Sequence, residues 1–514
     1  IGDTDTTKDE TEWANKRFNI VMLANGGENH ADTVVPKVRN SGKITVSAGG
    51  RNIIGLMAYK GAKAVSDEDI TITNSNNSIG MVLTGTNTSN KISSGTSSKK
   101  ISVTGKNATG IYNNGSNYEM TAGSIAVNGN KAIAVYASKA NNRQAITKLG
   151  AGTISASGDG SIGLYADGGS DIELNGTTIN IGDKGLFFFG KAENSDEAQL
   201  KLTGNATVNV ASGGTAFYVK KSNSGSPLAS IRHAGSTGTL TVNLANGSTL
   251  MVAEGNGGTA SPERISSLSS VGSSSVTGIN IVGTAGQYVP YKALRVPLLV
   301  DRNSNLDSAT DTYLNSEFSS SSVTIDTGIT VSGSGALTSP TKLVKKSKVA
   351  IAQKNTNSIN RNDVILTNKG TINFTGNDMA GIVGEYSEIN NNKTINVTGA
   401  NSTGIISANG SLATNNGTIK IGKGGTGLAG INYLGVTATP ASSIPTYGNQ
   451  SIELVHNGKI ISTGNTAAIG VLAIDLKSVV DKNGATHNIT NANAAKITLG
   501  SNSTIDVSSA AGGV

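Results

Sequence analysis

The sequence predicts an all-β fold, namely a right-handed parallel β-helix (a solenoid) with about 24 residues per coil and with protruding loops. The first observation behind this prediction is a unit that occurs three times between residues 368 and 428. Its central isoleucines, Ile372, Ile395 and Ile419, are 23 and 24 residues apart. A fixed period in the twenties, made of short strands and turns, is typical of a solenoid.

The second observation is the composition. The 514 residues include 66 glycines but only 7 phenylalanines, 12 tyrosines and one tryptophan, so 4% of the chain is aromatic. Several large globular cores would need more aromatic side chains than this. Small and β-branched residues instead suit the narrow core of a solenoid, in which stacked Ile and Val side chains fill each coil.

The structure of one coil is predicted by the residues 394–405. In Thr-Ile-Asn-Val at 394–397 the two apolar residues are two positions apart, so both point inward while Thr and Asn face solvent. Gly399 follows, where a tight corner needs a positive φ angle. A Gly-Ile pair at 404–405 starts a second strand and turns another apolar residue inward. Asparagines at equal corner positions, such as Asn391 and Asn415, are expected to stack as ladders.

The first half of the chain contains a capping segment and a first block of coils. Residues 1–40 do not follow the repeat and are predicted to be an N-terminal capping segment. Residues 41–256 are predicted to form β-helix block 1. Its units begin at apolar residues that are 24 to 31 positions apart, which fits coils of about 24 residues lengthened in places by loops. These apolar residues are Ile44, Ile70, Ile101, Ile125, Ile154, Ile179 and Val208.

The second half begins with a break in the pattern. Residues 257–322 are predicted to be an irregular insertion, and 323–514 to be β-helix block 2 with a loop at 432–450. Insertions in solenoids often lie on the binding face, and Tyr and Arg are favoured at binding hot spots. The alternative is that the insertion only pads or caps the rod at a break. The candidate ligand-binding residues are Tyr288, Tyr291 and Arg295 in the insertion and Tyr433 and Tyr447 in the loop.

Catalytic, metal and cofactor sites are not predicted. The chain has no cysteine, which excludes thiolate metal sites and cysteine nucleophiles, and its four histidines are isolated from one another. The acidic run Asp67-Glu68-Asp69 has no counterpart one coil away and is interpreted as a solvated corner. The glycine-rich segment at 422–427 lacks the Gly-Lys-Ser/Thr ending of a phosphate-binding loop.

Charge and hydropathy limit the partners. The formal net charge of +7 is small for this length and its basic residues are spread out, so no nucleic-acid partner is predicted. The chain has no run of about 18 apolar residues, and we expect no direct membrane insertion of this segment. It starts at Ile1 without an initiator Met or signal peptide and stops at Val514 in mid-pattern. We therefore expect a segment of a longer protein.

These repeats resemble those of a known family. Thr-Ile-Asn-Val-Thr-Gly-Ala-Asn-Ser-Thr-Gly-Ile at 394–405 and Asn-Asn-Gly-Thr-Ile at 415–419 are similar to the passenger repeats of large monomeric (type V) autotransporter adhesins, most closely the fusobacterial outer-membrane adhesins. The resemblance covers most of 41–253 and 323–507. It implies a right-handed β-helix displayed on the bacterial surface by a C-terminal translocator barrel. It also implies adhesion to host cells or partner bacteria, in some members through lectin-like or immune-receptor binding.

The expected function is therefore that of a non-catalytic, monomeric adhesin segment at the bacterial cell surface. Its expected partners are a host-cell protein or glycan, or the surface of a partner bacterium. Two alternatives stay open. One is a polysaccharide-degrading β-helix enzyme, for which the scattered Asp and Glu offer no obvious catalytic pair. The other is a structural spacer whose binding site lies elsewhere in the full-length protein.

Overall fold

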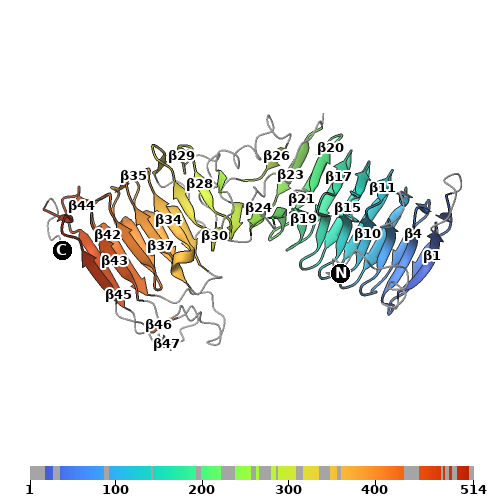
Figure 1. The fold of residues 1–514 in the computed structure, drawn as a ribbon, viewed down its shortest axis with the longest axis horizontal. Coiled ribbons are helices and arrows are strands. Elements are labelled where there is room, and N and C mark those ends of the chain that lie inside the picture. Colours follow the sequence, from blue (N-terminus) through green and yellow to red (C-terminus); the bar gives the residue numbers. More distant parts are fainter. Residues whose placement is uncertain are drawn as a thin grey trace. The chain divides into compact units, whose positions relative to one another are not determined.

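In a computed structural model the described strands stack into long parallel sheets, so the predicted parallel β-helix is confirmed. The structure describes residues 18–26, 35–85, 92–140, 143–192, 198–221, 238–255, 262–264, 279–284, 287–307, 317–334, 348–355, 360–432, 451–475, 478–480, 486–488 and 495–508. The chain divides into two compact units. Unit 1 comprises residues 1–255 and 270–288, and unit 2 comprises residues 256–269 and 289–514. Within each unit the strands stack side by side (Figure 1).

A complete coil contains three strands that belong to three separate parallel sheets, which we call sheets 1, 2 and 3. In unit 1, sheet 1 consists of β1 (Asn19–Asn25), β4 (Ile53–Tyr59), β7 (Ile79–Thr84), β10 (Thr109–Asn114), β13 (Ile133–Ser138), β16 (Ile162–Asp167), β19 (Leu186–Ala192), β22 (Thr215–Lys221) and β24 (Thr249–Glu254). Sheet 2 consists of β2 (Lys37–Asn40), β5 (Lys63–Ser66), β8 (Ser94–Ser97), β11 (Asn117–Met120), β14 (Ile146–Leu149), β17 (Asp171–Leu174) and β20 (Gln199–Leu202). Sheet 3 consists of β3 (Ile44–Val46), β6 (Ile70–Ile72), β9 (Lys100–Thr104), β12 (Ser124–Asn128), β15 (Gly152–Ser157), β18 (Thr177–Ile181), β21 (Ala206–Val210), β23 (Leu240–Leu244) and β26 (Ile279–Val282).

Unit 2 repeats this arrangement. Its sheet 1 consists of β27 (Val289–Leu294), β30 (Glu317–Ser319), β33 (Val349–Lys354), β36 (Ala380–Glu385), β39 (Thr403–Ala408), β42 (Thr426–Asn432) and β45 (Ile469–Asp475). Sheet 2 consists of β25 (Glu263–Arg264), β28 (Leu298–Val300), β31 (Val323–Ile325), β34 (Ile365–Asn368), β37 (Glu388–Asn391), β40 (Leu412–Asn415), β43 (Glu453–His456) and β48 (Lys496–Leu499). Sheet 3 consists of β29 (Ser304–Asn305), β32 (Thr330–Gly333), β35 (Thr371–Phe374), β38 (Thr394–Val397), β41 (Thr418–Ile421), β44 (Lys459–Ser462) and β49 (Thr504–Asp506). Unit 2 also contains the antiparallel pair β46 (Ser478–Val480) and β47 (Thr486–Asn488), and the 3-10 turn η3 (Arg361–Asp363).

The core of each unit is built from inward columns of Ile and Val. The seven apolar residues predicted to open the units of block 1 are register partners along sheet 3, from Ile44 to Val208, and all seven are buried. Ile372, Ile395 and Ile419 form the equivalent column in unit 2 and are likewise buried. The predicted period is thus the actual spacing between stacked residues. Each column excludes water along its length, which is the main stabilising contribution of a solenoid.

The corners show why Gly and Asn recur. The positive φ angle expected at Gly399 is found instead at Asn401, with a φ of 55°. Glycine is required at 399 for a different reason: a Cβ atom there would lie 1.8 Å from the carbonyl oxygen of Gly376 in the preceding coil. The predicted asparagine ladder is confirmed at the next corner: Asn368 donates to Asn391 (2.8 Å) and Asn391 donates to Asn415 (2.6 Å). These amides are fully buried and satisfy one another across the coils.

The repeat extends further than the sequence predicted. Residues 19–25 and 37–40, placed in the capping segment, form β1 and β2 and pair with β4 and β5. Residues 289–305, placed in the irregular insertion, form β27, β28 and β29. These segments lack the Thr-Ile-x-Val signature, but their backbones pair in register with the neighbouring coils, and Ala24, Val38, Tyr291 and Leu298 are buried. The predicted loop at 432–450 lies outside the described residues except for Asn432, the last residue of β42.

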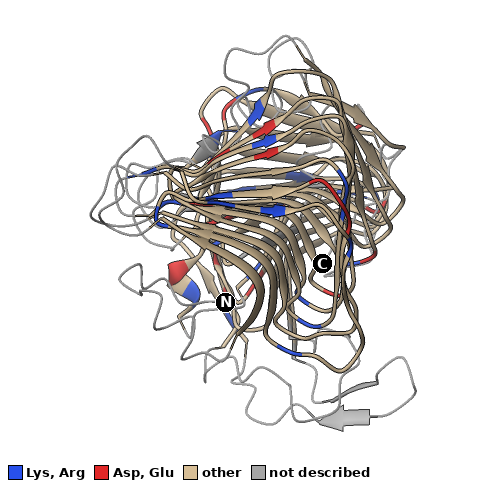
Figure 2. Cartoon of the chain, turned by 90° about the vertical axis from the view of Figure 1, so that its right-hand side faces the viewer, with Lys and Arg blue, Asp and Glu red and all other residues tan. Residues whose placement is uncertain are grey.

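Charged residues are interspersed over the described chain, with Lys and Arg next to Asp and Glu (Figure 2). Ion pairs of this kind occur in both units, for example Lys201 with Asp171 (2.6 Å) and Lys354 with Glu385 (3.0 Å). Within the described ranges no helix is long and apolar enough to cross a membrane.

Candidate ligand-binding groove

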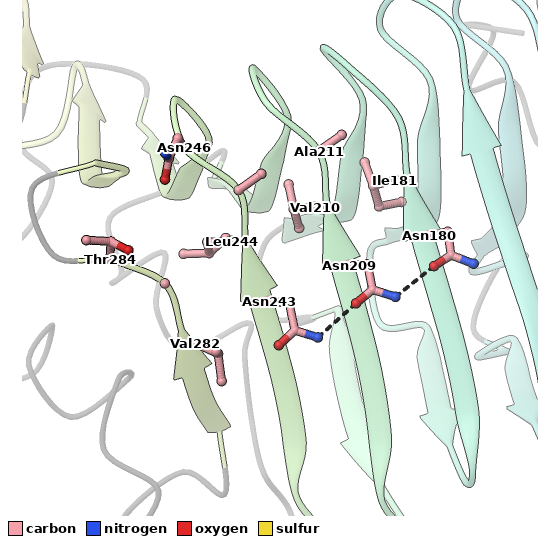
Figure 3. Close-up of a pocket in the computed structure, with 12 residues that line it drawn as sticks. Asn180, Ile181, Asn209, Val210, Ala211, Asn243, Leu244, Asn246, Val282 and Thr284 are labelled. Atoms are coloured by element: carbon pink, nitrogen blue, oxygen red, sulfur yellow. Dashed lines mark hydrogen bonds between the residues drawn. The ribbon is translucent and has the colours of Figure 1, made fainter.

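A groove lies on the outer face of unit 1, where the last strands of sheet 3 turn into their corners (Figure 3). Its volume is about 700 Å3. The strands β18, β21, β23 and β26 and the turns that follow them form its walls. The lining residues are Asn180, Ile181, Asn209, Val210, Ala211, Asn243, Leu244, Ala245, Asn246, Val282, Gly283 and Thr284.

The polar side of the groove is an asparagine ladder. Asn180, Asn209 and Asn243 are register partners in adjacent strands. Asn243 Nδ2 donates to Asn209 Oδ1, and Asn209 Nδ2 donates to Asn180 Oδ1, both at 2.8 Å (Figure 3). Because each amide has a second N–H and a second lone pair, the ladder still offers donors and acceptors to a ligand at each coil. The mutual hydrogen bonds hold these groups in a fixed orientation before any ligand arrives.

The ladder ends in the middle of the groove. The register partner of Asn243 in the next strand is Val282, which is 47% exposed. The amide row therefore gives way to an apolar patch, with the Oδ1 atom of Asn243 at the junction. Leu244 and Val210, which are largely buried, supply the apolar floor beside it. An amide edge next to an apolar floor is the usual composition of a small-ligand site.

Tyr288 supports the wall of the groove. A Cβ atom on Gly283 would lie 3.1 Å from Tyr288 Cδ1 and 3.2 Å from Leu244 Cβ, so the tyrosine ring and the leucine pack against Gly283. Burial raises the pKa of Tyr288, and its hydroxyl therefore stays protonated at neutral pH. Of the five residues proposed from the sequence, Tyr288 is the one that the structure places next to this groove.

The other proposed residues lie elsewhere. Tyr291 points into the core from β27 and is 0% exposed, so the expectation that it projects from the solenoid is wrong. The alternation of apolar residues in 289–293 turns its ring inward. Arg295 follows β27 at a corner with a φ angle of 55° and is half-buried. Tyr433 and Tyr447 lie outside the described residues.

Sequence reasoning missed the asparagine ladder of the groove. The Thr-x-Asn pattern of β18, β21 and β23 was correctly predicted to face solvent, but it was interpreted only as scaffold. The signal that distinguishes this place is the replacement of Asn by Val at position 282, in the same column. The column from Asn180 to Val282 can be identified only when the strand pairing is known, because loops of unequal length separate its members in the sequence.

The groove contains no titratable side chain. Its lining is amide, hydroxyl and aliphatic, and it offers neither a carboxylate pair nor an imidazole for acid–base chemistry. Among the described residues no group of three or more His, Cys, Asp or Glu side chains is placed to hold a metal ion. The arrangement is thus suited to binding through hydrogen bonds and apolar contact.

Comparison with known proteins gives no further assignment, because no family model, no curated protein and no solved structure matches this chain.

Proposed function

We propose that this chain is a segment of a bacterial cell-surface adhesin, the passenger of a type V autotransporter, and that it binds its target through the groove of unit 1. The observation that carries the proposal is a preformed groove, with an amide ladder on one side and an apolar floor, on a scaffold of stacked coils. The repeat style at 394–405 supports the autotransporter class. The target is a host-cell protein or glycan, or the surface of a partner bacterium.

A binding function is favoured over catalysis because of what lines the groove. A glycoside hydrolase needs two carboxyl groups on opposite sides of its substrate. The groove supplies amides at regular intervals instead, which recognise a ligand without activating it. Regular spacing across coils also lets several weak contacts act together along an extended ligand, which suits attachment.

The proposal is tested by filling the groove. Ala245 is exposed at the corner after β23, and its side chain lines the groove. The Ala245→Trp variant places an indole in the groove, and we expect binding to weaken by at least about tenfold. The matched control is Thr398→Trp in unit 2, because Thr398 is also exposed and also follows a strand of sheet 3. The control is expected to bind as the unaltered chain does.

The assay measures binding of the purified, labelled chain to host cells, to partner bacteria and to a glycan array. If the unaltered chain binds none of these, the adhesin proposal fails for this segment and the spacer alternative is favoured. If Ala245→Trp binds as tightly as Thr398→Trp, the groove is not the site. Release of reducing sugars from a polysaccharide panel would favour the enzyme alternative.

A further inference from the structure

A row of stacked aromatic rings runs along sheet 1 of unit 1, whereas the groove is lined by strands of sheet 3 and the turns that follow them. Its members are register partners in five consecutive strands, β10 to β22. The ring centroids are 5.0, 4.8, 4.6 and 5.2 Å apart, with interplanar angles of 2°, 29°, 24° and 23°. We call this row the tyrosine ladder. It consists of Tyr112, Tyr136, Tyr165, Phe189 and Tyr218.

The ladder faces outward. In each strand the residue just before the ring is fully buried in the solenoid core, as Ile111 and Val135 are. The ladder rings themselves are half-buried. Because each ring lies face to face with the next, the faces are covered and the ring edges are what remains. Five such edges at the spacing of β-strands form a strip on the order of 20 Å long.

An aliphatic row borders the strip on one side. Ile133, Ile162 and Leu186 are register partners and are also half-buried. In β7, two coils before Ile133, the position of the aliphatic row is occupied by Ile79 and the position of the tyrosine ladder by Val82. Ile79 and Val82 pack in one cluster together with Tyr112. The aliphatic row and the tyrosine ladder are therefore adjacent. Together they make a continuous apolar strip that runs across the strands.

A polar row borders the strip on the other side, and its charges balance. Lys191 pairs with Asp167 (3.5 Å), and Lys220 pairs with Glu254 (3.0 Å). A ligand's net charge therefore contributes little to its affinity here. The Tyr112 phenol also stays neutral: burial, helped by the Asp167 charge and opposed by the Ser138 hydrogen bond, raises the pKa of Tyr112 to about 12.

We propose that the tyrosine ladder is a binding site for a flat, elongated, conjugated molecule whose long axis lies along the ladder. The edge of an aromatic ring carries partial positive charge and its face carries partial negative charge. A flat molecule lying on the strip presents its face to five ring edges, which is the favoured edge-to-face geometry repeated at every coil. The aliphatic row buries one side of the ligand. This site is separate from the groove and does not rest on the adhesin proposal.

The test uses thioflavin T, a cationic rotor dye whose fluorescence rises when a site holds it flat, on the complete chain. We expect saturable binding with little change between low and high salt. In the double variant Tyr165→Leu/Phe189→Leu, which interrupts the strip, affinity is expected to fall by about tenfold or more. Phe189→Tyr keeps the ring edge and is expected to bind as the unaltered chain does.

Two controls keep the result interpretable. Ile406→Leu lies in the equivalent outward column of unit 2, which has no rings, and is expected to leave dye binding unchanged. Far-ultraviolet circular dichroism and the melting midpoint show whether the double variant remains folded. If it has unfolded, the single variant Tyr165→Leu is measured instead, with the same expected direction. The proposal is overturned if the unaltered chain does not bind the dye, if the folded variant binds it equally well, or if salt abolishes binding.

Discussion

The outward column of sheet 1 differs between the two units although the register is the same. In unit 1 it contains the five rings of the tyrosine ladder, half-buried, with their edges outward. In unit 2 the corresponding residues are small and aliphatic: Ala352, Val383, Ile406 and Ala429. These four residues belong to a fully buried cluster. The inward columns, by contrast, are Ile and Val in both units.

This difference separates two kinds of constraint. An inward residue must fill a narrow core between stacked coils, so its size and shape hardly vary. An outward residue lies outside that narrow core, and its type varies more: the same column contains aromatic rings in unit 1 and small aliphatic side chains in unit 2. Both surfaces that we propose for binding lie in outward columns of unit 1. The comparison predicts that inward changes cost stability and that outward changes alter binding.

The largest effect is expected for the inward column of unit 2. Ile395→Ala removes a fully buried side chain and leaves a cavity, so unit 2 should lose about 2–5 kcal/mol of unfolding free energy. Ile505 occupies the same column in the last described coil but is 37% exposed. Ile505→Ala should therefore cost under half as much. Urea denaturation followed by circular dichroism measures both, and equal losses would contradict the role given to the column.

The second effect concerns Arg361, which joins three segments of unit 2. Its Nη1 atom donates to the carbonyl oxygens of Gly410 (3.0 Å) and Ser451 (2.9 Å), and its Nη2 atom contacts Glu453 Oε1 at 2.9 Å. Arg361→Ala removes these bonds, and unit 2 should lose about 2–3 kcal/mol.

The control for Arg361 is an exposed ion pair in unit 1. Arg39 contacts Asp67, with side-chain exposures of 58% and 35%. Because solvent screens such a pair, Arg39→Ala should cost at most about 1 kcal/mol. Hydrogen–deuterium exchange resolves the two units, and faster exchange around Gly410 and around 451–453 is expected only in the Arg361 variant. Unchanged exchange there would show that Arg361 does not fasten these coils.

The third prediction compares the buried and exposed asparagine ladders. Asn391→Ala in unit 2 breaks two buried hydrogen bonds and leaves Asn368 Nδ2 without its amide partner, which should cost about 1–3 kcal/mol. Asn209→Ala in unit 1 breaks two bonds whose atoms water can reach, and it should cost less than about 1 kcal/mol. Thermal unfolding of the two variants in parallel checks the order, and a reversed order would refute the distinction.

The smallest effect is a pH dependence confined to unit 2, where the buried ladder ends in a histidine. Asn415 Nδ2 lies 3.0 Å from His456 Nδ1, and His456 Nε2 lies 3.1 Å from the carbonyl oxygen of Thr504. Since Asn415 donates and the carbonyl accepts, the imidazole must be neutral with its proton on Nε2. Burial lowers the pKa of His456, although the Thr504 hydrogen bond opposes this.

The sign follows from the lowered pKa. The stabilisation by neutral His456 is complete above the unfolded value of 6.5 and is lost as pH falls through the lower folded value. The melting midpoint should therefore fall as the pH is lowered below about 6.5. His456→Asn continues the ladder without a titratable group and should flatten this part of the curve. A wild-type curve that is already flat there would contradict the assignment.

Asp307, a carboxyl of unit 2 with a shifted pKa, titrates in a different pH range from His456. Burial acts to raise the pKa of Asp307, but hydrogen bonds from Lys348 and Ser334 outweigh it and hold the pKa well below its usual range. Stability from Asp307 is thus lost only as pH falls below its unfolded value of 3.8. The His456 and Asp307 effects occupy separate pH windows.

The sequence alone predicts the inward columns of apolar residues, but it does not predict the outward surfaces that we propose for binding. Ile44, Ile70 and their successors could be aligned because the core admits few residue types, so the Thr-Ile-x-Val signature recurs. Strands β1 and β27 lack that signature and are not predicted by it: β1 contains five consecutive apolar residues, from Ile20 to Ala24, and β27 contains Pro290. The five ring positions are separated by 24 to 29 residues, because loops lengthen some coils. Their alignment into one column depends on pairing that spacing alone does not determine.

The candidate ligand-binding residues also show how far the sequence alone can predict side-chain positions. Tyr288 was singled out because it stands where the repeat signature fails, and the structure places it against the groove wall. Tyr291, three residues later, was chosen for the same reason and is a core residue. The loss of the Thr-Ile-x-Val signature therefore indicates that a coil differs from the repeat. It does not tell whether a given side chain points inward or outward, because that depends on the strand that the segment forms.

The most direct test of the central claim, that recognition lies in outward residues of unit 1, is the ratio of two dissociation constants. Binding to the same target cells is measured for Ala245→Trp in unit 1 and for Thr398→Trp in unit 2, with both variants confirmed as folded. We predict that Ala245→Trp binds at least about tenfold more weakly than Thr398→Trp. Equal constants, or weaker binding by Thr398→Trp, would contradict the claim.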